Sequence, residues 1–310
     1  MVLFSHLIPL YICYTKSTTM AQFERIIAIY NPNSTNNAAE KAEQFKTAAK
    51  KAGFTVHLFK TTHAGHAEEI AFTVAKQYKR PLIISVSGDG GYNEVINGVM
   101  RAKQTDNTKR PVVAVIGAGN ANDHKRTTRG NTPLLTLIKR DKPKPIDLVR
   151  LTTKDIERYA HSYIGLGITP EVGIELNKHS LSFVKELQII LKTFRDFTPF
   201  EIIIDGKRKR LGSLIFANIP GMAKVIKLSD KPTLSDGEFD IVKLSYRGKW
   251  RLILDMLLLA IRAKRSRSAS SSSFRTTSKL PVQLDGEIEE LAARSEVVIE
   301  SIHEAIESLY

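Results

Sequence analysis

Glycine and acidic residues gather directly after a short apolar run in the first third of the chain. Residues 87–99 read S-G-D-G-G-Y-N-E-V-I-N-G-V and follow the apolar run 81–86. Glycine accepts positive φ at little cost and lets the backbone approach a polyphosphate closely. Residues 92–100 show helical spacing, so the amides at that helix start would favour the same anion. The segment is therefore a candidate nucleotide site, although Asp-Gly pairs also make ordinary turns.

Two further polar turns follow predicted strands. The apolar run 26–30 precedes Asn31-Pro32-Asn33-Ser34, and the run 112–116 precedes the sequence G-A-G-N-A-N-D at 117–123. Strands that alternate with helices through short loops predict a parallel sheet, in which the carboxyl ends of the strands meet at one edge. Ligands of open α/β sheets bind at that edge. Both glycine loops and Asn31 are therefore expected to share one site.

The order of elements predicts the fold class α/β plus β. Residues 21–147 are expected to form a nucleotide-binding α/β domain around a doubly wound parallel sheet. Residues 148–310 are expected to form a β-rich domain, an antiparallel β-sandwich, and the last residues could return to the first domain. Helical patterns at 181–197 and 250–262 interrupt the β-rich part. The second is apolar on nearly every side and has basic ends, so it either packs on its own domain or lies in a membrane interface.

The first 20 residues are expected to stand outside the fold. Residues 3–14 are apolar, but the positive charge of Lys16 follows this block, whereas a signal peptide carries its charge in front. The block is also too short to span a membrane. The favoured interpretation of residues 1–20 is an upstream extension, or a misplaced start before Met20.

Composition narrows the class of protein. The chain has 310 residues, 42% of them hydrophobic, enough for one large core or two modest ones. A single cysteine, Cys13, excludes an internal disulfide and fits a reducing compartment such as the cytoplasm. His63 and His66 stand three apart with no further ligand expected nearby, so a helix start is favoured over a zinc site.

The net charge of +14 predicts attraction to polyanions, whether nucleotide, nucleic acid or anionic membrane. Basic residues cluster at 207–210 and 262–267. The first cluster follows a predicted strand and an Asp-Gly pair, which favours a solvated hairpin tip over a lipid headgroup contact. A specific nucleic-acid partner is not expected, because the Arg/Ser-rich segment 262–275 offers only Phe274 for base stacking.

Five blocks, in this order, resemble the diacylglycerol kinase catalytic domain superfamily, which includes bacterial lipid kinases and sphingosine kinases. They are Asn31 to Ser34 (N-P-x-S-G), Ser87 to Val99 (G-G-D-G-T-x-N-E-V-x-N-G-L), Gly117 to His124 (P-x-G-T-x-N-D-F), Asp236-Gly237 (D-G-x-L-D) and Leu284 to Glu287 (V-D-G-E). The resemblance covers residues 26–301. This chain departs from the patterns with Thr35 for glycine, Ser87 for glycine, Gly91 for threonine and Asn120 for threonine.

The resemblance implies an ATP-dependent lipid kinase that works peripherally at an anionic membrane, with diacylglycerol as the default acceptor and residues 148–310 as the β-rich lipid-substrate domain. It implies nucleotide contacts at Asn31, Thr61, Ser87, Gly88, Asp89, Gly90, Gly91, Tyr92, Asn93 and Asn120. Glu287 is implied as the catalytic base and Asp285 as the second choice, whereas the residues alone favour a hairpin turn. A Mg²⁺ ion is implied on Asp236 with Thr233 and Glu238, and a simple Asp-Gly turn is equally compatible with that stretch.

The departures at Gly91 and Asn120 keep a second function open. Each removes a hydroxyl that the pattern offers to phosphate, and charge-assisted hydrogen bonds contribute roughly 1.5 to 3 kcal/mol each. A nucleotide-binding regulator with lost or altered kinase activity is therefore the alternative. A homodimer is also left open.

Overall fold

The computed structural model describes residues 23–168, 197–222, 226–227, 234–261 and 267–310. Several predictions fall outside these ranges. They concern the extension at 1–20, nearly all of the helix at 181–197, Thr233, and most of the second basic cluster.

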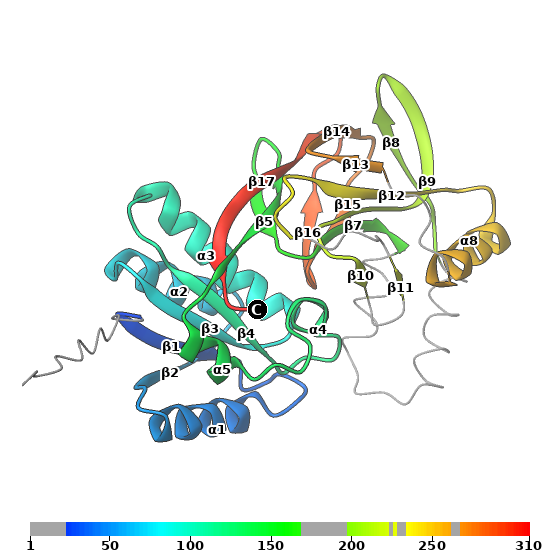
Figure 1. Ribbon diagram of the computed structural model, residues 1–310. Helices are drawn as coiled ribbons and strands as arrows, with labels where there is room; N and C mark the ends of the chain where they lie inside the picture. Colours follow the sequence, from blue (N-terminus) through cyan, green and yellow to red (C-terminus); the bar gives the residue numbers. More distant parts are fainter. Residues whose placement is uncertain (1–22, 169–196, 223–225, 228–233, 262–266) are drawn as a thin grey trace, which may run out of the picture.

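The first part of the chain is a parallel sheet between helices (Figure 1). Its strands are β1 (Arg25–Tyr30), β2 (Val56–Lys60), β3 (Pro81–Ser87) and β4 (Val112–Gly117), in the spatial order β4-β3-β1-β2. Its helices are α1 (Ala38–Lys51), α2 (His66–Gln77), α3 (Asp89–Thr105), α4 (Asp123–Thr128) and α5 (Leu134–Arg140). Every residue of β3 is buried, as expected for a central parallel strand covered on both faces.

The period of two along β3 divides its side chains between two cores. Ile83 joins the core formed with α2 and α3, whereas Leu82 and Ile84 join the core formed with α1 and α5. Helices therefore cover both faces of the sheet, which is the doubly wound arrangement. The turns at the carboxyl ends of β1, β3 and β4 remain accessible at one edge.

The second part is built mainly from antiparallel strands. These are β5 (Lys144–Thr152), β6 (Glu157–Ala160), β7 (Tyr163–Gly167), β8 (Phe200–Ile204), β9 (Lys207–Ala217), β12 (Phe239–Ser245), β13 (Arg267–Ala269), β14 (Ser271–Thr276), β15 (Leu280–Leu284), β16 (Glu287–Leu291) and β17 (Glu296–Ser308). The short pair β10 (Gly221–Met222) and β11 (Ile226–Lys227) stands apart, and α8 (Lys249–Ile261) lies at the end of this part (Figure 1). Parallel strands with helices followed by largely antiparallel strands confirm the predicted fold class.

The last strand joins the two parts. β17 pairs antiparallel with β14 and β5, and its end pairs in parallel with β4 through Glu307 opposite Val112. Figure 1 shows β17 running from the antiparallel strands down to the parallel sheet. Ile306 and Leu309, at 2% and 3% exposure, are buried against the first part. The C-terminal segment therefore fixes the position of one part against the other.

The first basic cluster lies where the sequence pattern places it. Ile204 pairs with Lys207 across a two-residue turn, and the turn residues Asp205 and Gly206 have φ of 52° and 70°. Two positive φ values in succession fit the tight turn that matches strand twist. Residues 207–210 are exposed and lead out of this turn, so the predicted hairpin tip is confirmed.

Candidate functional site

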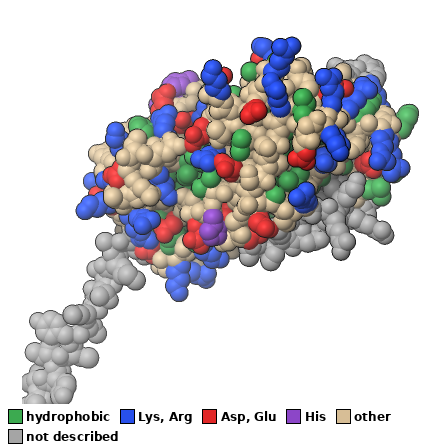
Figure 2. All heavy atoms as spheres, turned by 90° about the horizontal axis from the view of Figure 1, so that it is seen from above, with side chains coloured by type: hydrophobic (Ala, Val, Ile, Leu, Met, Phe, Trp, Pro, Cys, Tyr) green, Lys and Arg blue, Asp and Glu red, His purple; other side chains and the backbone are tan. Residues whose placement is uncertain are grey.

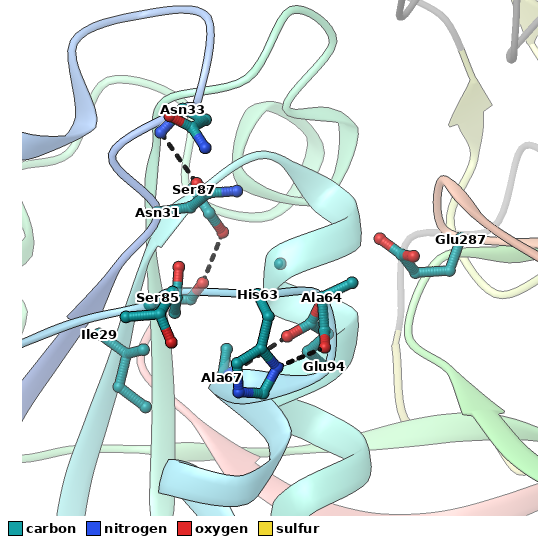
Figure 3. A pocket seen from close by; sticks show the side chains of 13 residues that line it. Ile29, Asn31, Asn33, His63, Ala64, Ala67, Ser85, Ser87, Glu94 and Glu287 are labelled. Atoms are coloured by element: carbon teal, nitrogen blue, oxygen red, sulfur yellow. Dashed lines mark hydrogen bonds between the residues drawn. The ribbon is translucent and has the colours of Figure 1, made fainter.

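A cavity of about 250 Å³ opens at the carboxyl ends of β1 and β3 (Figure 3). Its lining residues are Ile29, Asn31, Asn33, Thr61, Thr62, His63, Ala64, Ala67, Ser85, Ser87, Gly91, Glu94 and Glu287. Five of these were expected at a nucleotide or catalytic site: Asn31, Thr61, Ser87, Gly91 and Glu287. The strand ends bring the first four together, and β16 brings Glu287 from late in the chain.

The two glycine loops touch backbone to backbone beside this cavity. The amide of Ala118 donates to the carbonyl of Ser87 at 2.7 Å. A Cβ on Gly119 would lie 2.5 Å from the Cα of Gly88. No side chain fits between the loops, so both positions need glycine for the strand ends to meet.

Ser87 and Gly91 share one small volume at the start of α3. A Cβ on Gly91 would lie 2.5 Å from the Oγ and 2.7 Å from the Cβ of Ser87. The serine side chain therefore fills the space that a threonine side chain at position 91 would need. The Ser87 hydroxyl contacts the Oγ of Ser85 at 2.6 Å and donates to the carbonyl of Gly88 at 3.0 Å. The two departures from the family pattern compensate each other sterically.

Glu287 reaches the start of α3 from a tight hairpin. Leu284 pairs with Glu287 across Asp285 and Gly286, whose φ values are 51° and 108°. The hairpin turn that the residues alone favour is confirmed. It places the Glu287 carboxylate against the α-carbon of Gly90, so closely that a Cβ there would collide with Oε1. Figure 3 shows the Glu287 side chain pointing toward the cavity across from α3.

Asp285 is the anchor of that hairpin. Its side chain is fully buried and accepts hydrogen bonds from the amides of His161 (2.6 Å), Ser162 (3.0 Å) and Tyr163 (2.9 Å) and from Nδ2 of Asn93 (2.9 Å). Burial raises the pKa of Asp285 to about 6, while these hydrogen bonds oppose the rise. With both oxygens occupied and its side chain outside the cavity lining, Asp285 positions the neighbouring Glu287 and is less accessible to a substrate hydroxyl than Glu287.

The Glu287 carboxylate is the acid of the hairpin that faces the cavity. The residue as a whole is exposed, but desolvation of its carboxylate at the cavity wall raises its pKa, and the negative charges of Glu94 and Glu289 add to the rise, while Arg158 opposes it. A carboxylate with a raised pKa is a stronger base than an ordinary glutamate. Glu287 therefore has both the location and the basicity to accept a proton.

Asp89 faces α4 and ties the two loops together. Its carboxylate accepts hydrogen bonds from the amides of Asp123 (2.9 Å) and His124 (3.2 Å), the first residues of α4. Burial, with a smaller contribution from the charge of Asp123, raises the pKa of Asp89 to about 7. Asp89 is not among the residues that line the cavity.

Three other predicted residues lie away from the cavity lining. Tyr92 is fully buried in the core and its hydroxyl lies 3.4 Å from Oγ of Ser308. Asn93 is buried, and its side-chain amide donates to Tyr159 O at 2.7 Å as well as to Asp285. Asn120 is partly buried in the loop after β4. The structure thus gives Tyr92 and Asn93 packing and positioning contacts.

Glu94 is the main functional candidate that the sequence reasoning missed. It lines the cavity, and its two oxygens accept hydrogen bonds from the amides of Gly65 and Ala67, both at 3.0 Å. Glu94 therefore holds the loop after β2 and the first turn of α2 against α3. The signal was present in the sequence, because Glu94 is the acid of the N-E-V stretch.

A cluster of three possible metal ligands lies at the start of α2, and the spacing of its two histidines in the sequence did not reveal the third. The side chains of His63, His66 and Glu69 place one ligand atom each within 4.8 Å of one another. Glu69 is thus the neighbour that the sequence analysis did not expect. Nδ1 of His66 accepts the amide hydrogen of Thr62 at 3.1 Å, which is the bonding of a helix-start histidine.

The predicted metal residues lie in a turn next to β17. Oδ1 of Asp236 accepts the amide hydrogen of Glu238 at 3.1 Å, and Gly237 donates to the buried carboxylate of Asp147 at 2.6 Å. Asp147 also accepts from the Glu304 amide at 2.7 Å. The Asp-Gly turn is therefore present, and the acid Asp236 offers the oxygen chemistry that Mg²⁺ prefers. Asp236 and Glu238 do not line the cavity that contains Glu287.

Within the ranges that the structure describes, no helix combines the length and the hydropathy needed to cross a bilayer.

Comparison with known proteins agrees with these features. Residues 25–151 match the diacylglycerol kinase catalytic domain. The diacylglycerol kinases of Staphylococcus carnosus (strain TM300) and Bacillus subtilis (strain 168) are 25% and 26% identical to this chain; each match covers 85% of this chain and 89% and 90% of the relative. The sphingoid long-chain bases kinase 1 of Arabidopsis thaliana is 34% identical over 109 residues, 34% of this chain and 14% of the relative. A crystal structure of a diacylglycerol kinase from Bacillus anthracis str. Sterne superposes with a TM-score of 0.69 at 20% identity, covering 94% of this chain and 98% of that one.

Proposed function

We propose that this protein, whose residues 25–151 match the diacylglycerol kinase catalytic domain family, is an ATP-dependent lipid kinase. It transfers the γ-phosphoryl group of ATP to a hydroxyl of a lipid such as diacylglycerol. The observation that carries the proposal is the Glu287 carboxylate, which faces the glycine-rich start of α3 at the cavity. A phosphate site and a proton acceptor on opposite walls of one cavity suit phosphoryl transfer.

The chemistry requires alignment, charge neutralisation and one base. The lipid oxygen attacks the γ-phosphorus, the bond to the β-phosphate oxygen breaks, and the hydroxyl proton moves to Glu287. ADP leaves with the bonding electron pair. The backbone of residues 88–91 and the polar side chains of Asn31 and Thr61 line or border the space for the phosphates.

Ser87 occupies the space that a side chain at position 91 would take, and this favours the hypothesis of an active kinase over that of a regulator without activity. Gly91 lacks the hydroxyl of the family threonine, but Ser87 brings a hydroxyl into the same volume at the cavity wall. At the other departure, the side-chain amide of Asn120 retains a hydrogen-bond donor. A polar group therefore remains near each of the two positions.

We also propose that Asp236, with Thr233 and Glu238, holds a Mg²⁺ ion away from the nucleotide. The donors are oxygens of the kind that Mg²⁺ takes. Thr233 lies outside the described residues. When bound, the ion would supply positive charge that stabilises this turn, which is hydrogen-bonded to Asp147. It would take no part in the proton transfer to Glu287.

The test is a turnover assay on the purified full chain. Labelled ATP is incubated with Mg²⁺ or EDTA and with diacylglycerol, a sphingoid base, phosphatidylglycerol or NAD. We expect a labelled lipid in at least one lipid arm. Glu287→Gln should lower kcat by about 10² to 10⁴, the range for loss of a general base, while the Kd for ATP stays within about twofold.

The control for Glu287→Gln is Glu290→Gln, which changes an exposed acid of the same strand outside the cavity lining. A Glu287→Gln protein with full turnover would refute the assignment of the base. ATP binding without turnover on any acceptor would favour the alternative, a nucleotide-binding regulator.

A further inference from the structure

Helix α8 presents an exposed apolar face. Trp250, Leu254 and Leu258 are 86%, 45% and 47% exposed. They are three of the five large apolar side chains that stand exposed in the described part of the chain. Their spacing of four residues keeps them within about 80° of one another around the helix. They therefore form one stripe.

The opposite side of α8 is anchored to the antiparallel strands. Leu252 is fully buried with Leu244 and Phe197. A Cβ on Gly212 of β9 would lie 2.6 Å from Cδ1 of Leu252, so the missing side chain at Gly212 forms a notch that receives Leu252. This anchoring fixes the orientation of α8. The exposed stripe is consequently a stable feature of the fold.

Basic side chains lie beside the stripe. The amide of Tyr246 donates to the carbonyl of Arg210 at 3.1 Å, and the Arg210 guanidinium lies 5.2 Å from the centre of the Tyr246 ring, so the β8–β9 hairpin adjoins the start of α8. Residues 201–210 and 246–258 together contain seven lysines and arginines and three acids. Figure 2 shows blue basic and green apolar side chains together at the end of the molecule where these elements lie.

We propose that Trp250, Leu254 and Leu258, with the basic residues 207–210, dock this protein on an anionic lipid bilayer. An apolar helix stripe with a tryptophan and a basic border suits insertion in the plane of the interface. Lysine and arginine near the surface are attracted by the charge of anionic lipids. The choice of a bilayer as the partner rests on the proposed function, because a kinase that acts on lipids must meet its substrate at a membrane.

Trp250 is the only tryptophan of the chain, so its fluorescence reports on this surface directly. The purified protein is mixed with vesicles of phosphatidylcholine alone, or with roughly 30 mol% phosphatidylglycerol to supply negative charge. We expect cosedimentation and a blue shift of the emission with the anionic vesicles only, both weakened by salt. Lipids brominated along the acyl chain should quench the emission.

The double variant Leu254→Gln/Leu258→Gln should weaken vesicle binding about tenfold or more by removing buried apolar area. Its matched control is Phe59→Gln, an exposed apolar residue on β2 that should leave vesicle binding unchanged. Unchanged emission with anionic vesicles would overturn the proposal. A blue shift that follows protein concentration without lipid would also overturn it, because the stripe would then bind a second copy.

A micelle assay separates this proposal from the proposed function. The double variant should keep wild-type turnover of a short-chain diacylglycerol dissolved in detergent micelles and lose turnover on vesicles. Wild-type protein that binds anionic vesicles but phosphorylates no lipid would refute the kinase and leave the docking surface intact.

Discussion

At the scale of single residues, the site depends on groups whose neighbours define their roles. Asp285 and Glu287 are two acids separated by a single residue. Asp285 is buried and accepts four hydrogen bonds, whereas Glu287 faces the cavity. Ser87 and Gly91 likewise make sense only as a pair, because one fills the space that the other leaves. The chemistry of each residue follows from what its side chain can reach.

The pair at positions 87 and 91 predicts a strongly non-additive double-mutant cycle. Gly91→Thr should collide with Ser87 and lower kcat/KM. Ser87→Gly should also lower it, by about tenfold or more, since a hydrogen bond to a charged group contributes roughly 1.5 to 3 kcal/mol. Ser87→Gly/Gly91→Thr restores the family pattern and should recover most of the activity. Steady-state kinetics at varied ATP measure the cycle, and additive losses would contradict the shared volume.

The raised pKa of Glu287 predicts a pH profile. The base must be ionised, so kcat should fall as the pH drops, with a midpoint above the ordinary glutamate pKa because desolvation of the carboxylate disfavours the charged form. Glu289→Gln removes a negative charge that contributes to the rise and should move the midpoint to lower pH. Initial rates across pH in both proteins check this. A midpoint that stays fixed in Glu289→Gln would contradict the electrostatic cause.

At the scale of elements, α3 is the support of the site. Its start bears the glycine loop and meets the Glu287 hairpin, while Glu94 holds the start of α2 through two amides. Farther along, Gly98 lies against the backbone of α2, so closely that a Cβ would collide with the carbonyl of Glu68. The single glycine of the N-E-V-I-N-G stretch therefore serves helix packing, whereas the glycines at 88, 90 and 91 lie at or beside the cavity.

Gly98→Ala should separate α2 from α3. Alanine normally stabilises a helix interior by about 1 kcal/mol over glycine, but the overlap with a rigid backbone here should reverse the sign, with a net loss of about 1 to 3 kcal/mol. Urea unfolding followed by circular dichroism measures it. Gly53→Asn, at a helix end with φ of 86° and open space, is a control expected to change stability little. A stabilised Gly98→Ala protein would contradict the close contact.

At the scale of the whole molecule, the chain builds the parallel part first and the antiparallel part second, and its last strand, β17, returns to the parallel part. β17 carries one set of pairs to β14 and β5 and another to β4. The hairpin with Glu287 belongs to the second part, while the glycine loops belong to the first. The catalytic arrangement therefore requires both parts to keep one relative position, and β17 is the continuous connection between them.

Ile306→Ala should weaken both parts together. A buried isoleucine reduced to alanine costs about 2 to 5 kcal/mol, and Ile306 packs in the core shared by α2, α3 and β5. Thermal unfolding followed by near-ultraviolet circular dichroism, which senses the packing of buried aromatic side chains, and by far-ultraviolet circular dichroism should shift equally. The exposed Phe59→Ala is the matched control. Two separated transitions in Ile306→Ala would show that the parts unfold independently.

Local patterns in the sequence predicted the helices and strands and the resemblance to a family, because both depend on short stretches of residues. Apolar runs before glycine turns located the parallel strands, and the five motif blocks in order led to the diacylglycerol kinase resemblance, which the comparisons confirm. The residue types at Asp285-Gly286 also predicted the tight turn.

Which side chains come into contact depends on how distant segments of the chain pack together, and this is visible in the tertiary structure alone. In the sequence, Ser87 and Gly91 are two separate departures from the family pattern, and only the structure shows that they share one volume. Glu287 lies nearly two hundred positions from the glycine loop, and no local pattern measures that approach. Trp250, Leu254 and Leu258 could not be told from core residues, since the sequence of α8 is apolar all round and the notch at Gly212 selects which face is buried. Local sequence preferences determine which helices and strands form, whereas long-range packing determines which side chains come into contact.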